Sequence, residues 1–297
     1  MNGVFAFDMG GTFLKSACIT EDRRIVGNTV MVPSCSEKGR DFILEAWEES
    51  FAALRDIAQK HDVAVTGIGI STPGPFDFER GIPLMSQKFA AIYGLDMTKL
   101  LREKSGLPDT VPFKFVHDAN AFLMGEVLCG AAGGYQNCAG ITLGTGLGFA
   151  AMVKGEILHN GYQTPYIALY KQPYQDGILE DFISTRGLCE AYQKLNGDKE
   201  PLPGAKELAQ RAFHGDGAAL SVMERLGKVL GQHAAYLLSH TRTECLVVGG
   251  QISKDFSLFG DSLKAALAET VCLQKIVPAR YPEKAALFGA AAQFYFR

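Results

Sequence analysis

Two glycine-threonine loops, each directly after an apolar strand, constrain this chain more than any other feature. The first strand, 4–7, continues into Asp8-Met9-Gly10-Gly11-Thr12, and the second, 140–143, continues into Gly144-Thr145-Gly146-Leu147-Gly148. Each segment predicts a strand, a tight turn and a strand. Backbone N–H groups in such a turn point into one concavity, which suits an anion such as phosphate. We expect the glycines to take positive φ and to let the ligand approach closely.

One such loop would predict no more than a hairpin. Two similar loops in separate halves, the first led by a strand-end aspartate, predict two sites that close on the phosphates of a nucleotide.

Composition and length set the broad class. A chain of 297 residues is expected to form two domains. It is 47% hydrophobic and 21% charged, and its net charge of −3 gives no reason to expect nucleic acid or a membrane as a partner. The seven cysteines are scattered without a Cys-x-x-Cys pair, which favours free thiols in a reducing compartment. With no signal peptide and no apolar run of membrane-spanning length, we expect a cytoplasmic protein.

Strands and helices alternate along the chain, which predicts an α/β fold. Apolar residues at helical spacing indicate a helix at 40–59, and the second glycine loop repeats the strand-turn-strand pattern of the N-terminus. No flexible linker separates the two halves, so we expect them to meet at a cleft. The other expected strands are 65–70, 114–117 and 245–248, and the other expected helices are 120–128, 177–193, 205–213, 217–240, 256–269 and 285–295.

Five motifs in this order resemble those of ROK proteins, a family of bacterial sugar kinases and sugar-responsive repressors. They are Asp8–Thr12, Ser71–Pro75, Asp118–Ala121, Leu143–Gly148 and Val247–Gly250, and the resemblance extends to Leu287–Ala291 near the C-terminus.

The resemblance implies a two-domain actin-like ATPase (ribonuclease H-like) fold, with a central mixed sheet in each domain and the active site in the cleft between them. It implies a small domain of 1–117 plus 284–297 and a large domain of 118–283. The implied substrates are a sugar and ATP with Mg²⁺, and dimers are common in the family.

On the nucleotide side, Asp8 is expected to hold Mg²⁺, through water; the alternative is an aspartate that only caps a turn. Lys15 either adds a positive charge or is solvated on the outgoing strand. Gly249 and Gly250 resemble the family's adenosine-binding motif, although a plain turn would look the same. The residues expected to cradle phosphate are Gly10, Gly11 and Thr12 in one half and Gly144, Thr145 and Gly146 in the other.

On the sugar side, Asp118 follows a strand and precedes a helix, which suits a general base that takes the proton of the sugar hydroxyl. A helix-capping aspartate is the alternative. Glu180 matches the family glutamate that binds sugar hydroxyls, or is an ordinary charge in the first turn of a helix. The resemblance of the Ser71–Pro75 motif implies that Gly74 lies in the sugar-binding site. His117 stands where the family commonly has a sugar-binding asparagine, and the alternative is a buried histidine with no ligand role.

The chain departs from the family pattern on the sugar side. Lys171, Pro173 and Ile178 stand where many relatives have the cysteines of a zinc site, so we expect no zinc. Gly155–His159 resembles a second family motif that binds sugar and zinc, but its position predicts a plain hairpin. Its true counterpart is replaced by the aromatic, uncharged segment Gly161–Tyr166. We therefore expect ATP chemistry with a sugar of altered identity.

Three functions compete. The first is an ATP- and Mg²⁺-dependent kinase that phosphorylates a hexose or amino-hexose. The second is a non-catalytic regulator that binds nucleotide or sugar. Because the first strand begins by Val4, we do not expect the N-terminal DNA-binding domain of the repressors. A pure sensor would also need neither Asp8 nor Asp118. The third is an actin- or chaperone-like ATPase, whose chains are usually longer.

Overall fold

The computed structural model describes residues 1–197 and 204–295 and divides into two compact units. Unit 1 holds residues 1–130, 159–164 and 284–295, and unit 2 holds the described residues of 131–158 and 165–283. The segment 118–130 lies in unit 1 because its helix packs densely against the last helix of the chain. The domain boundary expected between 117 and 118 thus differs from the division by contacts.

Unit 1 is built on a five-stranded mixed sheet with the order β3-β2-β1-β4-β7. A meander of three antiparallel strands comes first, β1 (Asn2–Met9), β2 (Phe13–Thr20) and β3 (Ile25–Pro33). Two strands then run parallel to β1, namely β4 (Ala64–Thr72) and β7 (Phe113–His117). The first glycine loop joins β1 to β2, as the sequence predicts.

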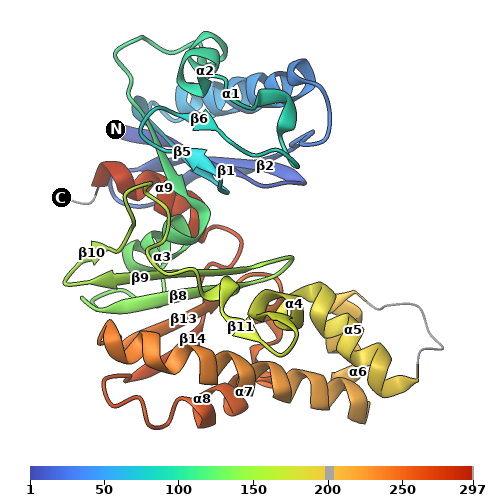
Figure 1. The fold of residues 1–297 in the computed structure, drawn as a ribbon. Helices are drawn as coiled ribbons and strands as arrows, with labels where there is room; N and C mark the ends of the chain where they lie inside the picture. Colours follow the sequence, from blue (N-terminus) through green and yellow to red (C-terminus); the bar gives the residue numbers. More distant parts are fainter. Residues whose placement is uncertain (198–203, 296–297) are drawn as a thin grey trace. The chain divides into compact units, whose positions relative to one another are not determined.

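Helices cover both faces of this sheet (Figure 1). On one face, α1 (Arg40–Lys60) packs Trp47 and Phe51 against Phe7, with ring centroids 4.9 and 4.8 Å from the Phe7 ring. On the other face lie α3 (Asp118–Leu128) and α9 (Ala285–Tyr295). Gly69 in β4 lets α9 approach closely, since a Cβ there would lie 2.1 Å from the Ala290 carbonyl oxygen. The smaller elements of unit 1 are β5 (Phe76–Asp77), β6 (Ile82–Pro83), η1 (Ala90–Ile92) and α2 (Met97–Ser105).

Unit 2 repeats the topology of unit 1 with the strand order β10-β9-β8-β13-β14. Again the antiparallel part comes first, β8 (Cys138–Leu143), β9 (Leu147–Val153) and β10 (Glu156–Ile157). Two strands run parallel to β8, namely β13 (Cys245–Gly249) and β14 (Lys275–Pro278). The second glycine loop joins β8 to β9, so each loop occupies the same place in its own sheet. The repeat that the sequence suggests is confirmed in the strand order.

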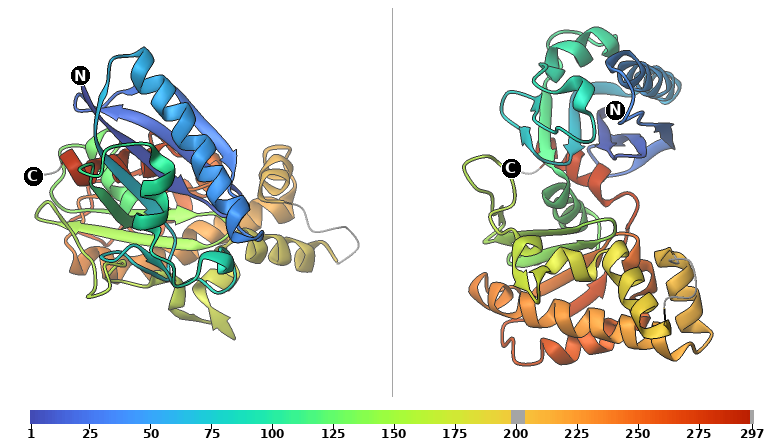
Figure 2. Two further views of the ribbon diagram at one scale, coloured as in Figure 1. Left: turned by 90° about the horizontal axis from the view of Figure 1, so that it is seen from above. Right: turned by 45° about the vertical axis from the view of Figure 1, so that its right-hand side comes forward.

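The helices of unit 2 pack on its sheet and against one another around a second apolar core (Figure 2). Besides its sheet and the long helix α7 (Gly217–His240), unit 2 contains η2 (Leu169–Lys171), β11 (Pro173–Tyr174), β12 (Gly177–Ile178), α4 (Leu179–Ile183), α5 (Thr185–Asn196), α6 (Ala205–Phe213), η3 (Ile252–Leu258) and α8 (Gly260–Ala266). The helix α7 contacts α4, α5, α6 and α8.

Two expected helices are wrong in their extent. The helix expected at 177–193 is a short strand followed by two helices, α4 and α5, because the backbone at Ser184 is extended (φ −75°, ψ 169°). The helix expected at 256–269 is the end of η3 followed by α8. Apolar residues at helical spacing lie on both sides of each break, so the spacing alone does not locate the breaks.

All seven cysteines are free thiols. Burial raises the pKa of Cys18 to about 11. Within the two described ranges, no helix is long and apolar enough to cross a membrane.

Candidate functional site

The candidate site of unit 1 lies at the carboxyl ends of its parallel strands. In the register, Asp8 at the end of β1 pairs with Ser71 of β4, and Thr72 pairs with His117 at the end of β7. Carboxyl ends of parallel strands are where open α/β sheets bind ligands. The fold thus places Asp8, His117 and the neighbouring Asp118 at one edge of one sheet.

Asp8 is a half-buried carboxylate whose surroundings disfavour its negative charge. Its pKa is raised from 3.8 to about 6, mainly because burial disfavours the charged form and also because the negative charge of Asp118 lies nearby. Lys15, its partner across the β1–β2 pair, and a hydrogen bond from Ser71 Oγ (3.2 Å) act in the opposite direction. Lys15 therefore acts on Asp8 electrostatically. A cation bound at Asp8 would also offset the free-energy cost of its negative charge.

The first glycine loop closes on itself through one glycine. The Gly10 N–H donates to the carbonyl oxygens of Asp8 and Phe13, both at 3.1 Å, so it is used inside the turn. Within residues 1–197 and 204–295, the Gly11 and Thr12 N–H groups have no acceptor, and they are the donors left for an anion. Neither Gly10 nor Gly11 takes positive φ, so that expectation is wrong. A side chain at position 10 is excluded sterically, since a Cβ on Gly10 would lie 2.9 Å from the Phe13 carbonyl oxygen.

Lys88 is a residue that the sequence analysis missed. A Cβ on Gly11 would lie 3.0 Å from Lys88 Nζ, so this ammonium group sits beside the glycine loop. Two contacts hold the surrounding segments in place: Ser36 Oγ donates to the Gly11 carbonyl oxygen (2.5 Å), and the Phe89 N–H donates to the Ser36 carbonyl oxygen (2.7 Å). No local pattern marks Lys88, because its position depends on tertiary packing.

Asp118 is the first residue of α3, and His117 is the N-cap. The Asp118 side chain is 49% exposed and its Oδ1 accepts from the Ala119 N–H (2.7 Å). His117 Nδ1 lies 2.9 Å from the same oxygen. A Cβ on Gly74 would lie 3.5 Å from His117 Nε2, and the Phe78 ring packs on the imidazole at 5.9 Å. The turn that contains Gly74 thus faces His117.

The second glycine loop is also closed by an internal hydrogen bond from a glycine, with a different partner spacing. The Gly144 N–H donates to the Gly146 carbonyl oxygen (3.0 Å), and both Thr145 and Gly146 are exposed. Neither Gly144 nor Gly146 takes positive φ, which again differs from the expectation. Among the described residues, the Thr145 and Gly146 N–H groups have no acceptor.

Gly249 and Gly250 lie directly beside this loop. Gly249 pairs with Thr142 at the end of β8. Gly250 takes φ of +87°, and a Cβ there would lie 2.2 Å from the Leu143 carbonyl oxygen. The two glycine segments of unit 2 therefore meet at the carboxyl ends of β8 and β13, and the positive φ of this region lies at Gly250, outside the glycine-threonine loop for which it was expected.

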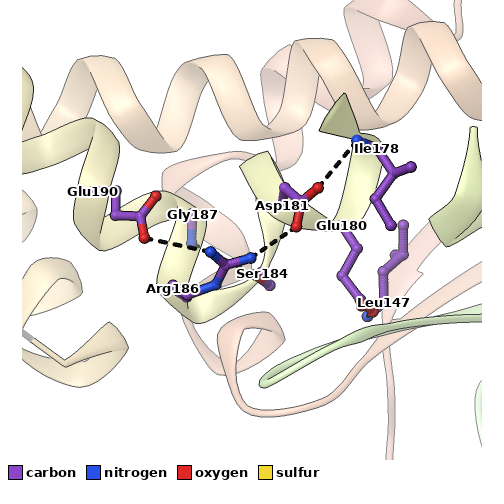
Figure 3. Close-up of polar contacts among 8 residues, drawn as sticks. All are labelled: Leu147, Ile178, Glu180, Asp181, Ser184, Arg186, Gly187 and Glu190. Carbon is purple, nitrogen blue, oxygen red and sulfur yellow. Dashed lines mark hydrogen bonds and ion pairs between the residues drawn. The ribbon is translucent and has the colours of Figure 1, made fainter. Parts of the chain in front are cut away.

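Glu180, in the first turn of α4, reaches the second glycine loop (Figure 3). Its Oε2 accepts from the Leu147 N–H (2.7 Å), and a Cβ on Gly146 would lie 2.8 Å from the same oxygen. Within the described ranges, Glu180 Oε1 has no donor. A carboxylate with one oxygen engaged and one available can accept from a further hydroxyl.

Of the three positions where relatives have zinc-site cysteines, Lys171 ends η2, and Pro173 and Ile178 pair with each other in a small hairpin of β11 and β12. None of the three side chains is a usual zinc ligand. Over residues 1–197 and 204–295, no three His, Cys, Asp or Glu side chains are grouped so that they could hold a metal ion. The segment Gly155–His159 is the expected hairpin, in which Glu156 and Ile157 pair with β9. In the segment 161–166, Tyr162 and Tyr166 are strongly exposed, and Asn160 holds the turn by accepting from the Tyr162 N–H (2.9 Å).

A duplicated mixed sheet, with a glycine turn after the first strand of each copy, is the architecture expected of an actin-like, ribonuclease H-like fold. The chain belongs to the ROK family, whose family model matches residues 4–295.

The chain is 26% identical to a glucokinase of Thermotoga maritima, with 96% of this chain and 95% of that protein covered. It is 27% identical to an N-acetylmannosamine kinase of Escherichia fergusonii, with 96% of each covered. It also matches the DNA-binding transcriptional repressor Mlc of Escherichia coli, at 25% identity over 69% of this chain and 54% of that protein. In fold, it is similar to a ROK glucokinase from Streptomyces griseus solved with glucose and AMPPNP, with a TM-score of 0.74, 23% identity and 98% of each chain covered.

Proposed function

We propose that this protein is an ATP-dependent carbohydrate kinase that phosphorylates a hydroxyl of a hexose or amino-hexose. The observation that carries the proposal is the position of Asp118, half-exposed at the end of β7 at the same sheet edge as Asp8 and the first glycine loop. The kinases among the relatives cover nearly the whole chain, which supports this assignment over the repressor.

In the proposed reaction, Asp118 is the general base. Its free oxygen Oδ2 accepts the proton of the sugar hydroxyl as the hydroxyl oxygen attacks the γ-phosphorus of ATP. The bond to the β–γ bridging oxygen breaks and ADP leaves. His117 and the Ala119 N–H hold Oδ1, so Oδ2 is the oxygen directed at substrate.

The phosphates are assigned to the glycine loops. The free N–H groups of Gly11 and Thr12 in unit 1, and of Thr145 and Gly146 in unit 2, are the proposed donors. Gly10 and Gly144 shape these turns through their own internal hydrogen bonds. Lys15 and Lys88 supply positive charge to unit 1, and Gly249 and Gly250 are assigned to the adenosine.

Asp8 fits a Mg²⁺ ion, because it is a hard oxygen ligand whose negative charge the fold leaves poorly compensated. Bound there, the ion would neutralise charge that develops on the phosphates. The sugar contacts are assigned to Gly74, His117, Asp118 and the free oxygen of Glu180. Since a histidine replaces the family asparagine and two exposed tyrosines replace a charged segment, the preferred sugar is expected to differ from glucose.

The test is release of ADP from Mg-ATP, measured with a panel of hexoses, amino-hexoses and N-acetylated sugars. Wild type is compared with Asp118→Asn and with Asp56→Asn, which removes an exposed carboxylate of α1. One sugar should stimulate ADP release in wild type and in Asp56→Asn, and this stimulation should fall by at least about a thousandfold in Asp118→Asn. Nucleotide binding without turnover for any sugar would overturn the kinase proposal in favour of a non-catalytic regulator.

Three further expectations stay predictions: a cytoplasmic location, the absence of a nucleic-acid partner, and a homodimer. Light scattering on the purified protein would test the homodimer.

A further inference from the structure

The junction between α4 and α5 contacts both ends of the second glycine loop. At one end, the Thr185 N–H and the Thr185 Oγ1 both donate to the Gly144 carbonyl oxygen, at 2.8 and 3.0 Å. At the other end, Glu180 Oε2 accepts from the Leu147 N–H at 2.7 Å. These three hydrogen bonds leave the exposed tip, Thr145 and Gly146, between two fixed points.

The break between the two helices makes the first contact possible. Because Ser184 is extended, the Thr185 N–H is the first of α5 and has no acceptor within its own helix. In a continuous helix this group would donate to the carbonyl oxygen of Asp181 instead. The departure from the helix expected at 177–193 is therefore the feature that connects this segment to the loop.

The junction itself is held rigidly. Asp181 Oδ2 accepts from the Ile178 N–H (3.1 Å), and its Oδ1 accepts from Arg186 Nη2 (2.7 Å) (Figure 3). Arg186 Nη1 also lies 3.6 Å from Glu190 Oε1. At Gly187, α5 approaches α4 so closely that a Cβ would lie 2.2 Å from the Asp181 carbonyl oxygen. These contacts hold Glu180 and Thr185 in place relative to each other.

We propose that Glu180 and Thr185 are positioning residues that clamp the loop Gly144–Leu147 and so preorganise its free N–H groups for nucleotide phosphate. This inference rests on the proposed nucleotide site and adds a second role to Glu180. One carboxylate oxygen holds the loop, and the other remains for the sugar. A loop that is ordered in advance binds more tightly because less conformational entropy is lost on binding.

Glu180 is tested by direct binding of Mg-AMPPNP without sugar, measured by calorimetry. Glutamine keeps an oxygen acceptor for the Leu147 N–H, whereas alanine removes it. We expect Glu180→Ala to raise the Kd by about threefold to tenfold and Glu180→Gln to stay within about twofold of wild type. If Glu180 served the sugar alone, both variants would bind AMPPNP like wild type, and that result would overturn its positioning role.

Thr185 is tested in the same assay with a matched pair. Thr185→Val removes the hydroxyl donor while keeping the shape and the backbone N–H, and Thr185→Ser keeps the hydroxyl. Valine should weaken AMPPNP binding by about threefold to fivefold, and serine should restore it. Equal Kd values for the two variants would contradict the clamp.

Wild type and a thermal melt separate the possible failures. If wild type does not bind Mg-AMPPNP, the proposed nucleotide site fails, and the clamp fails with it. If wild type binds and the Glu180→Ala and Thr185→Val proteins melt cooperatively with unchanged affinity, only the clamp is wrong. If either variant is unfolded, the conservative partner decides: Thr185→Ser or Glu180→Gln must then bind like wild type, or the clamp is rejected.

Discussion

His117 Nδ1 lies 2.9 Å from Asp118 Oδ1, so two consecutive residues at the end of β7 form a charge-assisted contact at the proposed catalytic base. The Ala119 N–H is nearer to Asp118 Oδ1 (2.7 Å) than to His117 Nδ1 (3.3 Å). The shorter contacts assign a proton to Nδ1, which then donates to the carboxylate. Nε2 is left facing the turn at Gly74.

This contact predicts that His117 positions Asp118. His117→Ala should lower kcat by about tenfold to a hundredfold, because Asp118 loses one of the two donors that orient it. His117→Asn restores the family residue and a side-chain N–H, and should recover part of that loss while changing which sugar gives the highest kcat/KM. His61→Ala, an exposed histidine at the end of α1, is the control. Equal kcat values for all four proteins would show that His117 has no part in the reaction.

The pKa of Asp8 makes folding stability depend on pH in a defined direction. Because the folded-state pKa of about 6 exceeds the unfolded value of 3.8, the folded protein binds a proton between these values that the unfolded chain has released. Asp8 therefore lowers the free energy of unfolding least below about pH 4. The free energy of unfolding then falls as the pH rises from about 4 through about 6.

Replacing Asp8 should consequently stabilise the protein while abolishing function. Asp8→Asn keeps an acceptor for Ser71 and removes the buried charge, so the free energy of unfolding should rise by up to about 3 kcal/mol at neutral pH and hardly change near pH 4. Urea unfolding at both pH values measures this, with Asp56→Asn as the exposed control. A gain of the same size at both pH values would mean that the charge of Asp8 is not its cause.

Much of unit 1 could be predicted from sequence because its signals are local. An apolar strand that ends in a glycine turn specifies β1 and β2, and an apolar strand followed by Asp118 and a helical pattern specifies β7 and α3. The strand order of a repeated βββ-αβ pattern then follows from the few topologies that such sheets adopt.

The features that the sequence did not predict depend on contacts between distant segments of the chain. The break at Ser184 lies between two amphipathic segments, and it is fixed by the close approach at Gly187 and by the hydrogen bond from Thr185 to Gly144. Lys88 lies beside Gly11 through packing across 77 positions of sequence, which no local spacing encodes. The glycine loops were also expected to need positive φ, whereas close packing against a carbonyl oxygen explains Gly10.

Lys88 is predicted to contribute to nucleotide binding through its charge. Lys88→Met keeps most of the stem and removes the ammonium group, so KM for ATP should rise by about threefold to tenfold, whereas Lys88→Arg should stay near wild type. Lys60→Met, at the exposed end of α1, controls for the loss of one surface charge. Initial rates over a range of ATP concentrations at fixed sugar measure the effect. A KM that is unchanged in Lys88→Met would remove Lys88 from the site.

Gly250 and Gly134 form a matched pair that separates backbone strain from steric overlap. Both take nearly the same positive φ, +87° and +89°, but a Cβ on Gly134 would meet no atom within 4 Å, whereas one on Gly250 would lie 2.2 Å from the Leu143 carbonyl oxygen. Gly134→Ala should therefore lower the free energy of unfolding by only about 1 to 2 kcal/mol, the cost of the left-handed conformation.

Gly250→Ala should lower the free energy of unfolding further, by about 3 kcal/mol or more, because the end of β8 must move to make room for the new Cβ. Since Leu143 directly precedes Gly144, the same movement should displace the second glycine loop and weaken Mg-AMPPNP binding, an effect that Gly134→Ala should not share. Urea unfolding and calorimetry on the two variants measure both quantities. If both variants lose the same stability and bind nucleotide equally well, then the contact between Gly250 and Leu143 does not position the loop.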